Sequence, residues 1–159
     1  MIRLGVLIMS CIFSFAGVLY VPRIGKSVSP EMRTLAVEDR SGDECRYVEF
    51  VVAKNGPFKE RVKAYLLVPY GDMKCPAVVM LHDHGARFDI GKEKLVKPMA
   101  DILEKGSEDH IMRSSQQWID KNFDGVYLAD SLASLGYVVL AADALYWGER
   151  SSEDAQRWS

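Results

Sequence analysis

The sequence has little net charge, few cysteines and no internal repeat. Its 20 Lys and Arg against 22 Asp and Glu give a net charge of −2, so its electrostatics give no reason to expect nucleic acid as a partner. Only three cysteines occur, none of them in a Cys-x-x-Cys spacing, which excludes the common structural zinc motifs. No low-complexity tract or second-domain linker interrupts the chain. Its 159 residues, 48% of them apolar, are enough for one globular domain with a core.

One long apolar run is present, at the amino terminus. Residues 4–21 are almost wholly apolar, with Arg3 before them and Arg23 and Lys26 after them. Such a segment is typical of a signal peptide or an uncleaved anchor. We therefore expect residues 1–21 to be a leader and the protein to be exported. It would then be periplasmic, extracellular or anchored to a membrane. Membrane contact is expected only through this segment if it is not cleaved; a buried amino-terminal helix is the alternative.

The stretch after the leader predicts a tether followed by a folded domain. Residues 22–43 are interrupted by prolines and glycines and are expected to be a tether, and residues 44–159 are expected to form the domain. In an oxidising compartment Cys45 and Cys75 could pair; two free buried thiols are the default expectation.

Two segments at the start of the domain predict an antiparallel hairpin. Residues 45–53 are rich in Val, Phe and Tyr, and residues 61–68 alternate between apolar and polar side chains. Between them, Asn55-Gly-Pro57 is a turn signal.

The next apolar runs predict parallel strands. Residues 77–81 are continuously apolar, as expected of a central strand covered on both faces, and are followed by His-Asp-His-Gly at 82–85. Residues 137–143 have the same pattern and are followed by Leu-Tyr-Trp-Gly-Glu at 145–149. Helical patterns lie between the two runs, so the unit is predicted to be strand, crossover and parallel strand.

Three helices are predicted in the crossover. The first is expected to begin near Pro98, carry Met99, Ile102 and Leu103, and end at Gly106, and the second to begin at 107–109 with Trp118 in the core. The third is expected to present Leu128, Leu132 and Leu135 to the sheet, with Asn122 or Asp124 as its cap and Gly136 just after its end.

Several of these motifs together resemble a known family. The strand followed by His-Asp-His-Gly-Ala at 82–86, Asn-Phe-Asp-Gly at 122–125, Leu-Gly-Tyr-Val-Val at 135–139 and the stretch 142–150 are similar to the amino-terminal half of an α/β-hydrolase. The most similar group is that of dienelactone hydrolases and acetyl xylan esterases, over residues 44–155. The fold class implied is α/β, a partial α/β-hydrolase sheet in which an antiparallel hairpin precedes a βαβ unit, truncated before the nucleophile elbow.

The resemblance also shows what is missing. The family's nucleophile lies in Gly-x-Ser-x-Gly, and neither this pattern nor Gly-x-Cys-x-Gly occurs in the chain. We therefore expect no catalytic nucleophile, acid or base within the chain, which would be an amino-terminal fragment of an ester hydrolase and inactive alone. The neighbour that residues 77–81 have in the family would lie after residue 159, leaving an open, aggregation-prone edge.

The same resemblance assigns the part of the site that the chain does contain. The loop at 82–86 implies an oxyanion donor, with the backbone N–H of His84 as the first candidate and that of Gly85 as the second. His82, Tyr146 and Trp147 are the candidate substrate-pocket residues. A small-molecule or carbohydrate ester is the implied substrate, and no cofactor is implied.

Residues around the second loop are assigned from local chemistry alone. Asp143 is expected to end a strand and cap a turn, and not to act as an acid. Glu149 and Arg150 are expected to pair with each other or with solvent.

Other interpretations of the His-Asp-His-Gly loop remain open. His82 and His84 with Asp83 and Asp89 could ligate zinc, but Gly85 predicts a turn that would separate the two imidazoles. The loop could also be a structural turn. If the 159 residues are the whole product, the protein could instead be a non-catalytic, hydrolase-like remnant or a small binding protein.

Overall fold

The computed structural model describes residues 31–51, 61–71, 74–85, 87–103 and 105–151. The predicted leader and the turn at 55–57 lie outside these residues. In the described part no helix is long and apolar enough to cross a membrane. The strands are β1 (Met32–Asp39), β2 (Asp43–Val51), β3 (Arg61–Pro69), β4 (Ala77–Leu81) and β5 (Val138–Ala142), the helices are α1 (Glu108–Asn122) and α2 (Leu128–Ser134), and the 3₁₀ turns are η1 (Lys92–Lys94), η2 (Ala100–Ile102) and η3 (Gly148–Arg150).

The strands form one mixed sheet in the order β1-β2-β3-β5-β4. β2 and β3 pair antiparallel along their whole length, from Asp43 opposite Pro69 to Val51 opposite Arg61, which confirms the predicted hairpin. β4 and β5 pair in parallel, with Val78 beside Val139. Because α1 and α2 lie between these two strands in the chain, the predicted βαβ unit is also confirmed.

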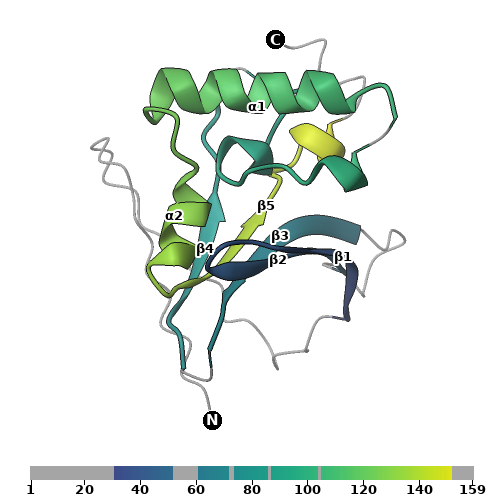
Figure 1. Ribbon diagram of the computed structural model, residues 1–159. Helices are drawn as coiled ribbons and strands as arrows, with labels where there is room; N and C mark the ends of the chain where they lie inside the picture. Colours follow the sequence, from purple (N-terminus) through teal and green to yellow (C-terminus); the bar gives the residue numbers. More distant parts are fainter. Residues whose placement is uncertain (1–30, 52–60, 72–73, 86, 104, 152–159) are drawn as a thin grey trace, which may run out of the picture.

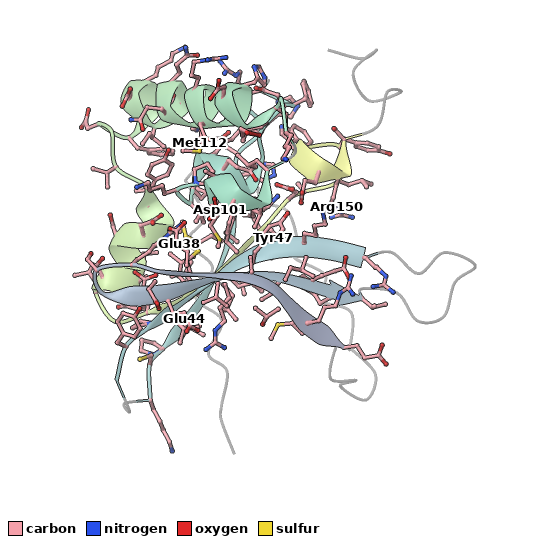
Figure 2. The ribbon with its side chains drawn as sticks, turned by 45° about the vertical axis from the view of Figure 1, so that its right-hand side comes forward. Glu38, Glu44, Tyr47, Asp101, Met112 and Arg150 are labelled. Atoms are coloured by element: carbon pink, nitrogen blue, oxygen red, sulfur yellow. The ribbon has the colours of Figure 1, made fainter. Side chains whose placement is uncertain are left out.

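The core lies between one face of the sheet and the helices, which share that side in Figure 1. Alternation along each strand sends every second side chain to this face. In Figure 2, Tyr47 lies on the helix side of the sheet and Glu44, three residues earlier, on the opposite side. The buried core residues of this layer are Cys45, Tyr47, Tyr65, Leu67, Leu95, Val96, Met99, Ala129, Ala133, Val139 and Ala141.

The expected tether at 22–43 is wrong for its second half. Residues 32–39 form β1, which pairs antiparallel with β2. The turn between them is closed by the amide of Arg40, which donates to Asp43 O at 2.9 Å, and Arg33 pairs with Glu49 across the strands at 2.8 Å. Backbone pairing and cross-strand charges therefore order a stretch whose composition predicted a linker.

The helix predicted near Pro98 is reduced to the single 3₁₀ turn η2. Met99 is extended, with φ −87° and ψ 115°, and is buried beside the sheet. Its amide donates to the Tyr65 hydroxyl at 3.4 Å. Burying this stretch against β3 therefore prevails over its helical pattern.

The two later helices agree better with the sequence. α1 begins at Glu108, as predicted. α2 has Tyr127 at its N-cap without a side-chain cap bond, so neither Asn122 nor Asp124 caps it. The helix ends at Ser134, and Leu135, predicted to face the sheet, is 74% exposed.

The strand β4 is not covered on both faces in the described part of the chain. It forms one border of the sheet, and Val79 and Leu81 are 54% and 77% exposed. Their neighbours Val78 and Met80 are half-buried, and Met80 packs against the core. Only one face of β4 is therefore covered, while the residues of the other face are as apolar as a buried strand.

Candidate functional site

The two loops predicted to form the site meet at the carboxyl ends of β4 and β5. The ring of His82 accepts a hydrogen bond at Nε2 from the amide of Ala144, at 2.9 Å. Because Nε2 is an acceptor, Nδ1 is the protonated nitrogen, 2.9 Å from Asp83 O. The amide of Gly148 donates to Phe88 O at 3.0 Å. His82 therefore joins the two loops.

His84 and Gly85 lie at the surface of this junction. No described residue accepts a hydrogen bond from the amide of either one. Gly85 has φ +46°, and a Cβ there would lie 2.2 Å from the ring of Trp118. Only glycine therefore fits this turn, which lies at the surface and whose two neighbouring amides have no described acceptor.

Aromatic rings surround the exposed turn. The ring of His84 packs edge-on against Trp147, at 5.0 Å between centroids, and against Phe88, at 5.8 Å. Phe88 and Trp147 are themselves 4.8 Å apart. Tyr146 is 49% exposed, has φ +76°, and makes no described ring contact. The structure thus brings His82, His84 and Trp147 together and leaves Tyr146 at the edge.

A buried charge cluster holds the loop that follows β5. The Lys92 ammonium lies 2.8 Å from Asp143, 3.0 Å from Glu93 and 3.2 Å from Glu149. The side chains of Lys92 and Asp143 are each 1% exposed. Asp143 also accepts from the amides of Lys92, at 2.7 Å, and Glu149, at 3.3 Å. It therefore ends β5 and caps the following turn, as the sequence predicted.

The charged groups in this cluster shift one another's pKa values. Burial favours the neutral amine of Lys92, but Glu93 and Asp143 prevail and hold its pKa well above the ordinary value. Burial likewise acts to raise the pKa of Glu149, but Lys92 and the Tyr47 hydroxyl lower it on balance. Glu149 pairs with Lys92 and, at 3.2 Å, with Lys63, while its side chain stays 40% exposed to solvent; the expected pairing with Arg150 is replaced by these two lysines. Lys92 and Glu149 are both charged at neutral pH.

Sequence reasoning missed the two lysines of the site. Lys92 and Lys94 stand in a Gly-Lys-Glu-Lys run that has the composition of a solvated turn, yet both are fully buried. The signal that could have identified them is the flanking pattern, because Ile90 before the run and Leu95 after it are core residues. A charged run between two core residues has to be covered or paired.

The structure offers no metal cage in the part of the chain that it describes. No group of three or more His, Cys, Asp or Glu there could hold an ion. Both ring nitrogens of His82 are hydrogen-bonded within the protein. Cys45 and Cys75 do not form a disulfide with each other; the first is buried and the second half-buried.

One described pocket lies next to the charge cluster, between the hairpin and η2. It has a volume of about 320 Å³, and its described lining includes Tyr47, Lys63, Glu93 and Glu149. None of the five predicted site residues lines it. The exposed turn at 84–85 is therefore a surface site, separate from this pocket.

The comparisons with known proteins agree on a hydrolase-like fold. No family model matches the chain. The Bacillus subtilis (strain 168) protein named "Putative hydrolase YtaP" is 32% identical over 120 residues, which are 75% of this chain and 32% of that protein. A crystal structure from Bacteroides fragilis, described as that of a "putative acetyl xylan esterase", superposes on 83% of this chain and 29% of its own, with a TM-score of 0.54 and 17% identity. This chain spans about a third of the length of these two proteins.

Proposed function

We propose that this chain is the amino-terminal part of an exported, serine-type carboxylic ester hydrolase of the α/β-hydrolase superfamily. The observation that supports it most is the exposed turn at His84 and Gly85. Its two amides have no acceptor among the described residues, and it lies at the carboxyl end of a parallel strand, where ligands usually bind in α/β sheets. The leader-like residues 1–21 motivate the export.

In this proposal the chain holds the charge that develops during ester cleavage. A serine outside these 159 residues would bond to the ester carbonyl carbon while its proton passes to a histidine base. The carbonyl oxygen, now negative, would accept hydrogen bonds from the amides of His84 and Gly85. The alcohol would leave with the transferred proton, and water would then release the acid. Trp147 and His84 would form the aromatic wall beside the acyl group.

The serine, its histidine and the acid that orients it would follow in the remaining part of the parent protein. This chain matches about a third of two hydrolase-like proteins and contains no Gly-x-Ser-x-Gly pattern. An acetylated carbohydrate or another small ester is the proposed substrate class.

The reading frame that encodes the chain provides the test. We expect it to continue after the codon for Ser159 with Gly-x-Ser-x-Gly, then an Asp or Glu, then a His. The extended polypeptide should hydrolyse p-nitrophenyl acetate, whereas residues 1–159 alone should not exceed the buffer rate. A stop codon directly after Ser159 would contradict the proposal and favour the non-catalytic binding protein. Saturable hydrolysis by residues 1–159 would contradict the missing triad.

A further inference from the structure

A fully buried lysine lies directly behind the exposed turn. The side chain of Lys94 is 0% exposed. Its ammonium lies 3.3 Å from Asp83 O and 3.2 Å from His84 O, and 3.5 Å from the Asp83 carboxylate. A buried ammonium has to be hydrogen-bonded, and here two consecutive main-chain carbonyls of the turn serve as acceptors.

The direction of those carbonyls fixes the direction of the next amides. Each carbonyl shares a planar peptide group with the N–H of the following residue, and in a trans peptide the two point in opposite directions. No cis peptide occurs in the described residues. When Lys94 holds the oxygens of Asp83 and His84, the N–H groups of His84 and Gly85 must therefore point away from it. Neither of these two amides has an acceptor among the described residues.

The lysine is itself held in place by aromatic rings. Its ammonium lies 4.7 Å from the ring centre of Trp118 and 6.0 Å from that of Trp147. The indole N–H of Trp147 donates to His84 O at 3.1 Å, which makes a second donor for that carbonyl. Gly85 packs against Trp118. The turn, the lysine and the two rings therefore form one packed unit that cannot rotate freely.

We propose that Lys94 is a positioning residue that directs the amides of His84 and Gly85 outward, toward an oxyanion. Its hydrogen bonds also polarise the two peptide groups, and this strengthens their N–H donors. The role of the two amides in binding an oxyanion rests on the proposed function. The role of Lys94 in directing the amides does not depend on it.

The test compares the complete 159-residue chain with two matched variants. Lys94→Met removes the buried donor at nearly constant volume, and Lys97→Met makes the same exchange at an exposed lysine three residues later. Residual dipolar couplings of ¹⁵N-labelled protein measure the directions of the His84 and Gly85 N–H bonds. Titration with inorganic phosphate, a tetrahedral oxyanion, measures anion binding through the shifts of the same two amides.

We expect Lys94→Met to change the couplings of both amides, to leave those of the sheet unchanged, and to weaken phosphate binding about tenfold or more. Lys97→Met should behave like the parent chain. If Lys94 only stabilised the fold, Lys94→Met would lower the melting temperature and leave the couplings of the His84 and Gly85 amides unchanged. That result would overturn the inference.

The two proposals fail in distinguishable ways. If phosphate shifts neither amide in the parent chain while Lys94→Met still reorients both, Lys94 is confirmed as a positioning residue and the oxyanion role is contradicted. If Lys94→Met does not fold, Lys94→Gln replaces it, since its shorter side chain cannot reach both carbonyls. Unchanged couplings in that variant would equally overturn the inference.

Discussion

At the scale of single residues, the site depends on charges whose burial no composition would predict. Lys92 and Lys94 are both buried, but their acceptors differ. Lys92 lies among carboxylates, whereas Lys94 is held mainly by main-chain carbonyls. The first therefore stabilises the fold by neutralising acids, and the second determines the direction of peptide groups.

Removing the Lys92 ammonium should be strongly destabilising. Lys92→Met leaves Asp143 and Glu93 buried without their cation, and we expect it to lower the free energy of unfolding by about 3 kcal/mol or more. Lys63→Met is the matched control, because Lys63 pairs with Glu149 at 3.2 Å but is 41% exposed, and it should cost less than about 1 kcal/mol. Urea unfolding monitored by circular dichroism measures both. An equal decrease in the unfolding free energy of the two variants would contradict this difference between the buried and the exposed lysine.

The lowered pKa of Glu149 predicts a loss of stability in acid. Because its pKa in the folded chain is below the ordinary value of 4.5, the carboxylate stabilises the fold fully above that value. This contribution is lost as the pH falls through the lower, folded value. We expect the unfolding free energy of Glu149→Gln to decrease less than that of the parent chain between pH 5 and pH 3. Parallel curves for the two proteins would show that Glu149 contributes nothing.

At the scale of elements, the sequence predicted strands better than helices. The hairpin, the parallel pair β4 and β5, and the start of α1 were all predicted, because alternation and apolar runs reflect burial directly. The helix expected near Pro98 is reduced to one 3₁₀ turn, because Met99 packs beside the sheet in an extended conformation. β1 was missed, because its side chains are mostly exposed and it is ordered by pairing with β2.

The end of α2 is a place where one glycine is required. Gly136 has φ +90°, its amide donates to Ala133 O at 2.9 Å, and the amide of Tyr137 donates to Leu132 O at 3.1 Å. These two bonds form a Schellman motif.

Gly136→Ala should lower the unfolding free energy by about 1 kcal/mol, because alanine disfavours this left-handed conformation. No atom lies within 4 Å of the added Cβ, so the effect would come from the backbone alone. Gly42→Ala, equally open but without a positive φ, should change stability by less than about 0.5 kcal/mol. The two thermal unfolding curves measure the difference, and a cost at position 42 as large as that at 136 would contradict the backbone explanation.

At the scale of the whole molecule, the sheet is covered by helices on one side. The opposite face of β4 and β5 includes Val79, which lies beside Leu140, and Leu81, which lies beside Ala142. β4 also borders the sheet. Main-chain groups and apolar side chains are thus exposed together, a combination that promotes pairing with another chain.

We expect the isolated chain to self-associate through this border. Val79→Lys places a charge on the exposed face and should reduce the apparent mass measured by light scattering. Val37→Lys is the control, since Val37 is similarly exposed, at 52%, but lies in β1 at the other border of the sheet. A monodisperse monomer of the parent chain, or an equal effect of both substitutions, would contradict association through β4.

The position of the site residues was predicted only in part. The turn at 82–85 and the loop at 145–149, which both carry residues assigned from the sequence, meet because parallel strands place their carboxyl ends at one edge of a sheet. The core residues Ile90 and Leu95 on either side of the run indicate that the two lysines are buried, but not which groups they bind. The acceptors of the lysines, and the bond by which His82 joins the loops, depend on which distant groups the fold brings within hydrogen-bonding distance, and neither spacing nor periodicity encodes that.

The hydroxyl of Tyr47 joins distant parts of the chain, because it lies in β2 and donates to Glu149 in the loop after β5. Glu149 continues the connection to Lys92 at 3.2 Å. An opening motion that frees the hairpin must therefore also release the loop beside the exposed turn. In hydrogen exchange, the amides of residues 43–51 and 143–150 should then lose protection together, as one cooperative unit.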